Sequence, residues 1–377
     1  LEWVDSVQRT APTADFVWVL NLYQDSIEDH ADLARLFRAD ASDPWGAQRV
    51  AFGIDAPVDI AIWELGNELD WDIHRSHFPL ETYVETCRAT IAAIRAVDPT
   101  AKFSAHAMTA PWSPRALQLP GGWAEWHQTV LRELGDDLDY IALHPYYHGL
   151  SMAEVEPYLD QITHDIRKIT GEDRIKLHIS EHAMWPPRLA GQPWSATWHQ
   201  THGLVGCLAT SEFFNRIYTR GDVAAANYHC FNGGPWAVIR RDEATGHPYR
   251  TGIYTLMQLY TEGVGSQVLP HQISGAQTDP AAPDLSLTAL TSRHPDGLAV
   301  VLTNRHPDLS REVQMQFSET YTLAAMSELT APTLDSHNQL NDDAISWHEI
   351  AHEARTGSTH TALVRPNSIA LLQFETN

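Results

Sequence analysis

Two glutamates, each placed directly after an apolar run with the length of a β-strand, could perform acid–base and nucleophilic chemistry. Glu68 lies in the segment Trp63–Asp70 (WELGNELD), and Glu181 lies in the segment His178–His182 (HISEH). Cleavage of a glycosidic bond needs two such carboxyl groups, one that protonates the leaving oxygen and one that attacks the anomeric carbon or activates water. The pair therefore indicates glycoside cleavage.

Histidines near these positions allow a second interpretation. His144, His148 and His182 join Glu181 as groups that could bind zinc, and a metal-dependent barrel hydrolase would use such a set. These four residues do not have the His-x-His or His-Glu-x-x-His spacing that is the usual signature of a zinc site on one element. We therefore expect no metal and no cofactor, with the metal-dependent hydrolase as the weaker alternative.

The elements that must position these side chains are short apolar runs separated by amphipathic helical patterns. The runs are Phe16–Tyr23, Val58–Leu65, Lys102–Ala107, Tyr140–His144, Lys176–Ser180 and Val223–His229. Helical periodicity is evident between them, in Pro79–Val97, Met152–Ile169 and Thr197–Tyr218. Strands that alternate with helices predict a parallel sheet with helical crossovers.

The spacing of roughly 40 residues per unit favours a (β/α)8 barrel, which keeps its catalytic groups at the strand ends. A doubly wound open sheet is the alternative, but no glycine-rich phosphate loop follows any run. The predicted fold class is α/β, with the barrel in residues 1–264. Two strands are missing before Phe16, and we expect them to lie in a segment absent from this chain or in a partner chain.

The pattern changes near residue 265. A stretch rich in Gly, Pro, Ser and Gln, Gly263–Asp284, reads as a linker. Beyond it come short alternating runs at Leu285–Leu290, Leu298–Thr303, Val313–Phe317, Tyr321–Leu329 and Ser368–Phe374. Residues 265–377 are therefore predicted to form a C-terminal antiparallel β-sandwich.

Composition excludes several classes of partner. The 377 residues include 25 Lys and Arg against 48 Asp and Glu, a formal charge of −23, so a nucleic acid or an anionic membrane is not expected to bind. No apolar stretch is long enough for a transmembrane helix. The start shows no charged and apolar leader pattern, so localisation is not indicated. The 13 tryptophans are compatible with sugar stacking, for which Trp63, Trp71, Trp185 and Trp236 are candidates.

Several segments resemble a known family of enzymes. WELGNELD resembles the acid/base segment that ends strand 4 in retaining glycosidases with (β/α)8 barrels, and Ser180-Glu181-His182 resembles their strand-7 nucleophile segment. Tyr140–Tyr146 (YIALHPY) resembles the strand-6 segment of glycoside hydrolase family 51, the α-L-arabinofuranosidases. Two tail segments, Leu329–Asn338 and Leu363–Leu372, resemble the end of that family's β-sandwich.

This resemblance implies roles for individual residues. Glu68 would be the acid/base and Glu181 the nucleophile, while His144 and Tyr146 would contact the sugar and the nucleophile. Asn67 would donate to the sugar 2-hydroxyl. The remaining candidates for substrate binding are Asn21 near the end of strand 3, Asn227 on strand 8, Trp63 and Trp185. One departure is visible, since the family usually has Asp-Glu-Trp where this chain has Ser180-Glu181-His182.

The predicted function is a retaining, exo-acting α-L-arabinofuranosidase that works through a covalent glycosyl-enzyme on plant-type polysaccharides or oligosaccharides. An endo-β-glucanase or a heparanase-like β-glucuronidase of the same clan remains open, as does a sugar-binding barrel without catalysis. The expected partner is a carbohydrate. By analogy with the family, a homo-oligomer, or a second chain that completes the barrel, is also expected.

Overall fold

The computed structural model describes residues 1–70, 78–108, 121–148, 152, 155–275, 287–294 and 296–376. Two compact units divide the chain. Unit 1 comprises Leu1–His144 and Tyr158–Ser180, and unit 2 comprises Pro145–Pro157 and Glu181–Asn377. Within the described residues, no helix combines the length and the apolar character that crossing a bilayer requires.

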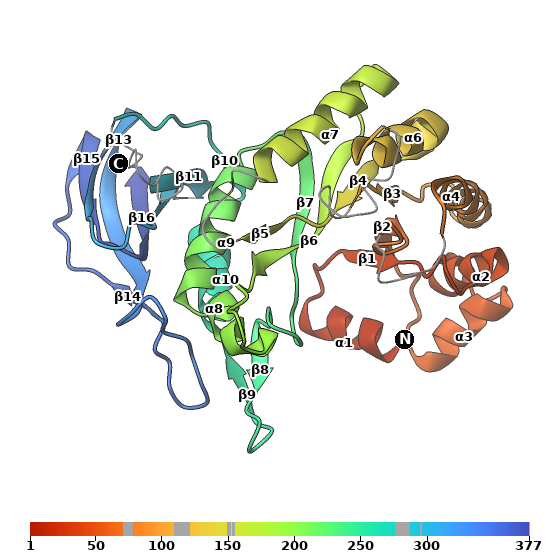
Figure 1. The fold of residues 1–377 in the computed structure, drawn as a ribbon, viewed down its shortest axis with the longest axis horizontal. Helices are drawn as coiled ribbons and strands as arrows, with labels where there is room; N and C mark the ends of the chain where they lie inside the picture. The colour runs from red at the N-terminus through yellow and green to blue at the C-terminus, as the bar shows by residue number, and fades with distance from the viewer. Residues whose placement is uncertain are drawn as a thin grey trace. The chain divides into compact units, whose positions relative to one another are not determined.

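Unit 1 contains a parallel sheet in the order β1-β2-β3-β4-β6. Its strands are β1 (Phe16–Val19), β2 (Ile60–Leu65), β3 (Phe103–His106), β4 (Tyr140–Leu143) and β6 (Lys176–Trp185), the last of which continues into unit 2. Its helices are α1 (Glu2–Thr10), α2 (Ile27–Arg38), α3 (Pro44–Phe52), α4 (Leu80–Arg95), α6 (Ala124–Leu134), the short 3-10 helix η2 (Gly135–Asp137) and α7 (Val155–Thr170), which begins in unit 2. Figure 1 shows α2, α4 and α6 following one another beside β1 to β4. The prediction of a mixed α/β fold built on parallel strands is confirmed.

The strands of this sheet form where the apolar runs predicted them. In β3 every residue is buried, and in β2 every residue except Ala61 is. A parallel sheet covered on both faces requires such continuous apolar sequences rather than alternation.

Two helices between β1 and β2 begin at strong local signals. Ser26 caps α2 through a reciprocal capping box with Asp29. Asp43 caps α3, Pro44 occupies its first turn, and Gly53 ends it with a left-handed φ of 108°. These two helices form the crossover between the first two strands of the described sheet.

Unit 2 contains the end of β6, which pairs in parallel with β5 (Tyr146–His148) and also pairs with β7 (Val223–Tyr228). Its helices are η3 (Trp194–Thr197), α8 (Trp198–His202), α9 (Leu204–Ile217) and α10 (Gly252–Gly263), and a hairpin is formed by β8 (Ile239–Arg241) and β9 (Pro248–Arg250). The helix predicted over Thr197–Tyr218 is interrupted at Gly203. A side chain at Gly203 would approach the carbonyl oxygens of His199 and Ser336 to within 2.7 and 2.8 Å.

A second sheet in unit 2 is antiparallel, in the order β10-β11-β12-β16-β13-β14, and β15 pairs with β13. Its strands are β10 (Gln267–Val268), β11 (Leu287–His294), β12 (Gly297–Asn304), β13 (Arg311–Thr330), β14 (Ser346–Glu349), β15 (Thr356–Val364) and β16 (Ser368–Thr376). The two runs predicted at 313–317 and 321–329 are one long strand, β13, whose pairing register shifts twice. The polar strands β14 and β15 were not predicted. The linker predicted over Gly263–Asp284 extends outside the described residues beyond position 275.

A buried ion pair joins α9 to the end of β12. Glu212 and Arg305 each have about 1% of their side chains exposed and contact one another directly. Arg216 also donates to Glu212, at 3.0 Å. Burial lowers the pKa of Arg305 to about 9, which leaves it charged at neutral pH. Charges that are both removed from water stabilise the fold only while they remain paired.

Replacement of Arg305 by Met should lower the free energy of unfolding by about 3–5 kcal/mol, because Glu212 loses its buried partner. The midpoint of urea denaturation measures the effect. Arg355→Met is the matched control, since Arg355 pairs with Glu353 where both side chains are largely exposed, and it should change stability by less than about 1 kcal/mol. Equal effects of the two substitutions would contradict this account of the buried pair.

Candidate active site

In unit 1, the predicted residues begin with a sharp turn directly after β2. Gly66 has a φ of 87°, and Glu68 has a φ of 49°. A side chain at Gly66 would come within 2.6 Å of the Leu69 side chain, so this position requires glycine. A left-handed φ is unfavourable for glutamate, and residues held in this way cluster at functional sites. The turn places the Glu68 side chain at the end of the strand.

Glu68 is held by a histidine from the end of β4. Nδ1 of His144 lies 2.9 Å from Oε1 of Glu68, whose side chain is 12% exposed. Nε2 of the same ring lies 3.0 Å from Oγ of Ser180, in β6. His144 itself is buried. The structure therefore brings the predicted Glu68 and His144 together and adds Ser180, which the sequence had marked only as a departure from a family pattern.

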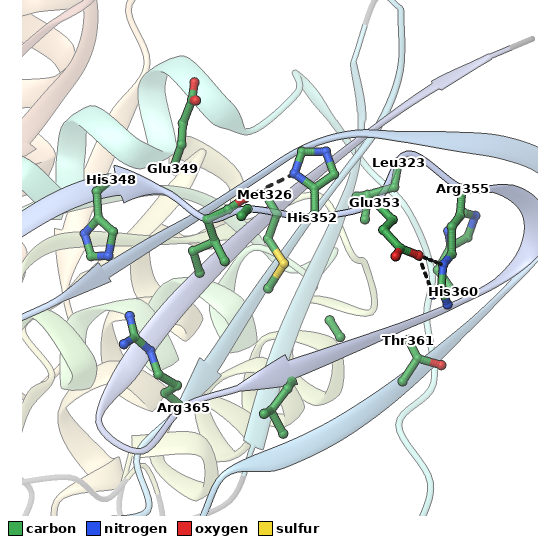
Figure 2. Close-up of a pocket in the computed structure, with 14 residues that line it drawn as sticks. Leu323, Met326, His348, Glu349, His352, Glu353, Arg355, His360, Thr361 and Arg365 are labelled. Carbon is green, nitrogen blue, oxygen red and sulfur yellow. Dashed lines mark hydrogen bonds and ion pairs between the residues drawn. The ribbon is translucent and has the colours of Figure 1, made fainter.

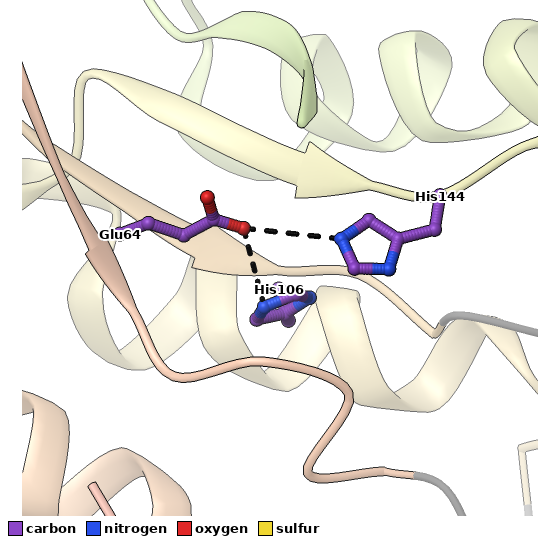
Figure 3. Close-up of side chains that lie close together, drawn as sticks. All are labelled: Glu64, His106 and His144. Carbon is purple, nitrogen blue, oxygen red and sulfur yellow. Dashed lines mark ion pairs between the residues drawn. The ribbon is translucent and has the colours of Figure 1, made fainter. Parts of the chain in front are cut away.

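A buried carboxyl group lies behind this contact (Figure 3). Oε1 of Glu64 is 3.4 Å from Nε2 of His106 and 4.0 Å from Nε2 of His144. These three residues could be read as ligands of a metal ion. However, Nε2 of His106 lies 2.6 Å from the carbonyl oxygen of Gly66. A carbonyl oxygen only accepts, so this nitrogen carries hydrogen and has no lone pair for a metal. The donor set does not fit a metal in this arrangement.

Burial keeps His106 neutral. It lowers the pKa of this histidine to about 3, helped by the charge that His144 would carry. The pKa of His178, which lies nearby in β6, is lowered to about 4 for the same two reasons. Nδ1 of His178 lies 3.2 Å from Oγ of Ser104, in β3. Neutral imidazoles therefore surround Glu64 and His144 in unit 1.

A separate group of predicted residues lies in unit 2, around Glu181. The hydroxyl of Tyr146, in β5, donates to Oε2 of Glu181 at 2.7 Å. Nδ1 of His229 lies 3.6 Å from the same oxygen. The Glu181 side chain is 23% exposed. Glu181 thus accepts a hydrogen bond and keeps part of its side chain open to solvent.

Aromatic rings surround the Tyr146 ring. Trp236 lies 5.0 Å away in a tilted contact, and Trp185 lies 5.4 Å away edge-on. Trp194 packs on Trp185 at 5.4 Å. The indole nitrogen of Trp236 donates to the carbonyl oxygen of Met184, which fixes that ring. Trp185 is half-buried and stays a candidate sugar platform.

His182 has a different role from the one considered in the metal interpretation. Its ring stacks on Phe213 with 4.0 Å between ring centroids and a 17° angle, and it also stacks on Tyr147. Neither ring nitrogen has a hydrogen-bond partner among the described residues. His182 thus serves as a buried aromatic ring, which removes it from the proposed set of metal ligands. The side chain of His148 lies outside the described part of the chain.

The other predicted binding residues occupy varied positions. The prediction for Trp63 is wrong, because this ring is fully buried and packs near Phe37 of α2, so no sugar can reach it. Asn67 and Asn21 are exposed, and the Asn21 amide contacts Gln24. Asn227 is half-buried in β7. Trp71 lies outside the described residues. Sequence analysis gave no signal for His106 or His229.

A groove of about 650 Å³ lies elsewhere, over β13, β14 and β15 (Figure 2). It is lined by apolar side chains such as Leu323 and Met326 together with charged groups. Arg355 is paired with Glu353 at its edge, as the dashed lines in Figure 2 show. None of the site residues predicted from the sequence lines this groove.

Two curated proteins that are similar to parts of this chain are both named arabinofuranosidases. No family model matches the chain. An intracellular exo-α-(1→5)-L-arabinofuranosidase of Streptomyces lividans is 24% identical over 197 residues, which is 49% of this chain and 29% of that protein. An exo-α-(1→6)-L-arabinofuranosidase of Bifidobacterium longum is 28% identical over 134 residues, which is 34% of this chain and 23% of that protein. The matches span less than a third of these relatives.

Solved structures show the fold. A family 51 α-L-arabinofuranosidase from Bifidobacterium longum superposes with a TM-score of 0.83 at 17% identity, covering 100% of this chain and 78% of that one. A family 51 arabinofuranosidase from Xanthomonas axonopodis gives 0.76 at 18% identity, covering 100% and 78%. The fold of the chain, a curled parallel half-barrel with further antiparallel sheets, is therefore family 51-like.

The buried His182 predicts a pH-dependent stability. Burial lowers its pKa to about 3, whereas it is near 6.5 in the unfolded chain. Between these values the unfolded state binds a proton that the folded state does not, so stability is lost as the pH falls below 6.5. His182→Phe should keep the stack and reduce this loss by about 1.4 kcal/mol per pH unit.

Chemical denaturation at pH 7, 6 and 5 measures this difference. His247→Phe, the same change at an exposed position, is the control and should leave the slope of stability against pH unchanged. An unaltered slope in His182→Phe would show that His182 does not stay neutral in the folded chain.

Proposed function

We propose that the protein containing this chain is a retaining glycoside hydrolase in which Glu68 is the general acid/base and Glu181 is the nucleophile. The observation that carries the proposal is the pair of differently held carboxyl groups. Glu68 is largely enclosed and contacts His144, whereas Glu181 is more open and accepts from Tyr146. Two carboxyl groups in different surroundings are what a double displacement requires.

The covalent chain supports the pairing of these groups. His144 and Tyr146 are separated by one residue, and Ser180 directly precedes Glu181. The residue that contacts Glu68 and the residue that contacts Glu181 therefore lie close together in the chain. A retaining mechanism requires the two carboxyl groups to lie about 5–5.5 Å apart.

The chemistry would proceed in two steps. The Glu181 carboxylate attacks the anomeric carbon while Glu68 gives its proton to the leaving oxygen, which takes the electron pair of the broken bond. Glu68, now a carboxylate, then removes a proton from water. The water oxygen attacks the anomeric carbon, and the ester bond to Glu181 breaks. Asn67 is proposed to donate to the sugar 2-hydroxyl.

The proposed substrate is an α-L-arabinofuranosyl unit at the end of a plant-type polysaccharide or oligosaccharide. The similar curated proteins are named exo-arabinofuranosidases, for (1→5) and (1→6) linkages, which favours this sugar over the glucan and glucuronide alternatives. The residues proposed to bind the substrate are Trp185, Asn21 and Asn227.

The proposed architecture is a complete (β/α)8 barrel with residues 1–264 as its part in this chain, followed by a β-sandwich in residues 265–377. The described parallel strands supply part of such a barrel. The remaining strands would come from another segment of the protein or from a partner chain. Apolar residues from β11, β12, β13, β15 and β16 form one core in the antiparallel part, which supports the sandwich.

Replacement of each carboxylate separates the two roles. Glu181→Ala in the full-length protein should abolish hydrolysis of both 4-nitrophenyl α-L-arabinofuranoside and arabino-oligosaccharides. Glu68→Ala should lower kcat/KM about 10²–10⁴-fold for the oligosaccharides and much less for the activated aryl glycoside, which needs no acid to leave. When azide is added to the Glu68→Ala variant, it should give an arabinosyl azide with the anomeric configuration of the substrate.

The exposed Glu133, which pairs with Arg88 on the surface, provides a control, since Glu133→Ala should retain wild-type rates. Activity that survives Glu181→Ala would overturn the proposed nucleophile. Cleavage of a β-D-glucuronide or a cello-oligosaccharide, with the arabinofuranoside untouched, would assign the runner-up substrate.

A further inference from the structure

The contact between Ser180 and His144 raises the question of which ring nitrogen carries hydrogen. His144 is buried and uses both nitrogens, Nδ1 toward Glu68 at 2.9 Å and Nε2 toward Ser180 at 3.0 Å. A neutral imidazole donates from one nitrogen and accepts at the other. A serine hydroxyl can do either, whereas an ionised carboxylate only accepts. The two partners therefore decide the tautomer together.

Charged and titratable groups face this ring from three strands. Oε1 of Glu64, in β2, lies 4.0 Å from Nε2 and would favour a second proton there. His106, in β3, packs edge-on with 5.3 Å between ring centroids. In β6, His178 has a pKa that is lowered by burial and by the charge that His144 would carry. Burial opposes an imidazolium at His144, while Glu64 and Glu68 favour it, and the two neighbouring histidines are neutral.

We propose that Ser180 is a positioning residue that donates its hydroxyl hydrogen to Nε2 of His144 and so fixes the neutral tautomer with hydrogen on Nδ1. The proposal rests on the proposed role of Glu68 as acid/base. In this tautomer Nδ1–H donates to Oε1 of Glu68 at every stage. The proton that moves during catalysis is then confined to the other oxygen, Oε2.

In this arrangement Glu68 is the residue that gives up and regains a proton, and His144 does not. When the glycosidic bond breaks, the proton on Oε2 goes to the leaving oxygen, and Oε1 still accepts from Nδ1. When water attacks, its proton returns to Oε2. His144 gains and loses no proton in either step, so no positive charge develops beside Glu68.

Removal of the hydroxyl should expose the opposing influence of Glu64. In Ser180→Ala, Nε2 can take a proton that faces Glu64, and the resulting imidazolium stabilises the Glu68 carboxylate. In the full-length protein, kcat/KM for a substrate with a poor leaving group should fall about 10-fold, but less than about 3-fold for an activated aryl arabinofuranoside. The basic limb of the pH profile should move about one unit lower.

Two further variants sharpen the test. Ser180→Thr keeps a hydroxyl and should restore both the leaving-group dependence and the pH profile. Adding Glu64→Gln to Ser180→Ala removes the charge that favours the imidazolium, so the basic limb should return upward. Selective ¹⁵N labelling of histidine, with His144→Gln for assignment, should show hydrogen on Nδ1 in the wild type and a shifted pattern in Ser180→Ala.

Ser104 offers a matched control, because its hydroxyl is also buried against a histidine, Nδ1 of His178. Ser104→Ala should leave the leaving-group dependence and the basic limb unchanged. If Ser180→Ala behaves like Ser104→Ala while Glu68→Ala still shows its leaving-group dependence, the proposal for Ser180 is wrong and the proposed function stands. If Glu68→Ala shows no such dependence, the proposed function itself fails.

Discussion

The polar groups of unit 1 depend on one constraint, the need to satisfy buried hydrogen-bonding atoms at the ends of a parallel sheet. Polar side chains such as Ser104 and His106 are buried in these strands, so each needs a hydrogen-bond partner there. His144 meets this constraint by contacting both Glu68 and Ser180. Segments that follow or belong to three strands thereby become linked through a single imidazole, and the orientation of the Glu68 carboxyl group follows from it.

In the antiparallel part of unit 2, a buried charge is paired with a buried opposite charge. Glu212 lies on a helix that is buried along nearly its whole length, and it meets Arg305 at the end of β12. A network of hydroxyls and amides surrounds the same helix, in which Ser211 and Asn215 contact Thr303. Polar contacts of this kind fix one docking geometry between a helix and a sheet, whereas apolar packing alone tolerates several.

Much of the parallel sheet could be predicted from the sequence, because six apolar runs at regular spacing leave few other folds. Glu68 could be found because it stands in a distinctive segment after such a run, and the structure gives it the predicted partner, His144. Trp63 was misassigned, since a strand buried on both faces offers no alternation to show which side chain faces a site. The contact of Ser180 depends on pairing across the sheet, which a single sequence does not specify.

Other differences have local physical causes. At the helix break, the amide of Leu204 donates to the carbonyl oxygen of Ser336, far along the chain, and a side chain at Gly203 would come within 2.8 Å of that oxygen. The strands β14 and β15 escaped prediction because their side chains are largely polar. In the sequence His182 appeared to be a candidate metal ligand, but its buried ring stacks on Phe213 and Tyr147. In each case tertiary contacts outweigh the local pattern.

The left-handed backbone at Glu68 has an evolutionary implication. Glycine and asparagine adopt this conformation more readily than glutamate, so either would relax the turn after β2. A lineage under selection for stability alone would drift toward those residues, and the carboxylate would disappear early. A glutamate at a position where the backbone disfavours it therefore points to a demand other than stability. Descendants of this chain that have become pure sugar-binding proteins should be recognisable by the residue at this one turn.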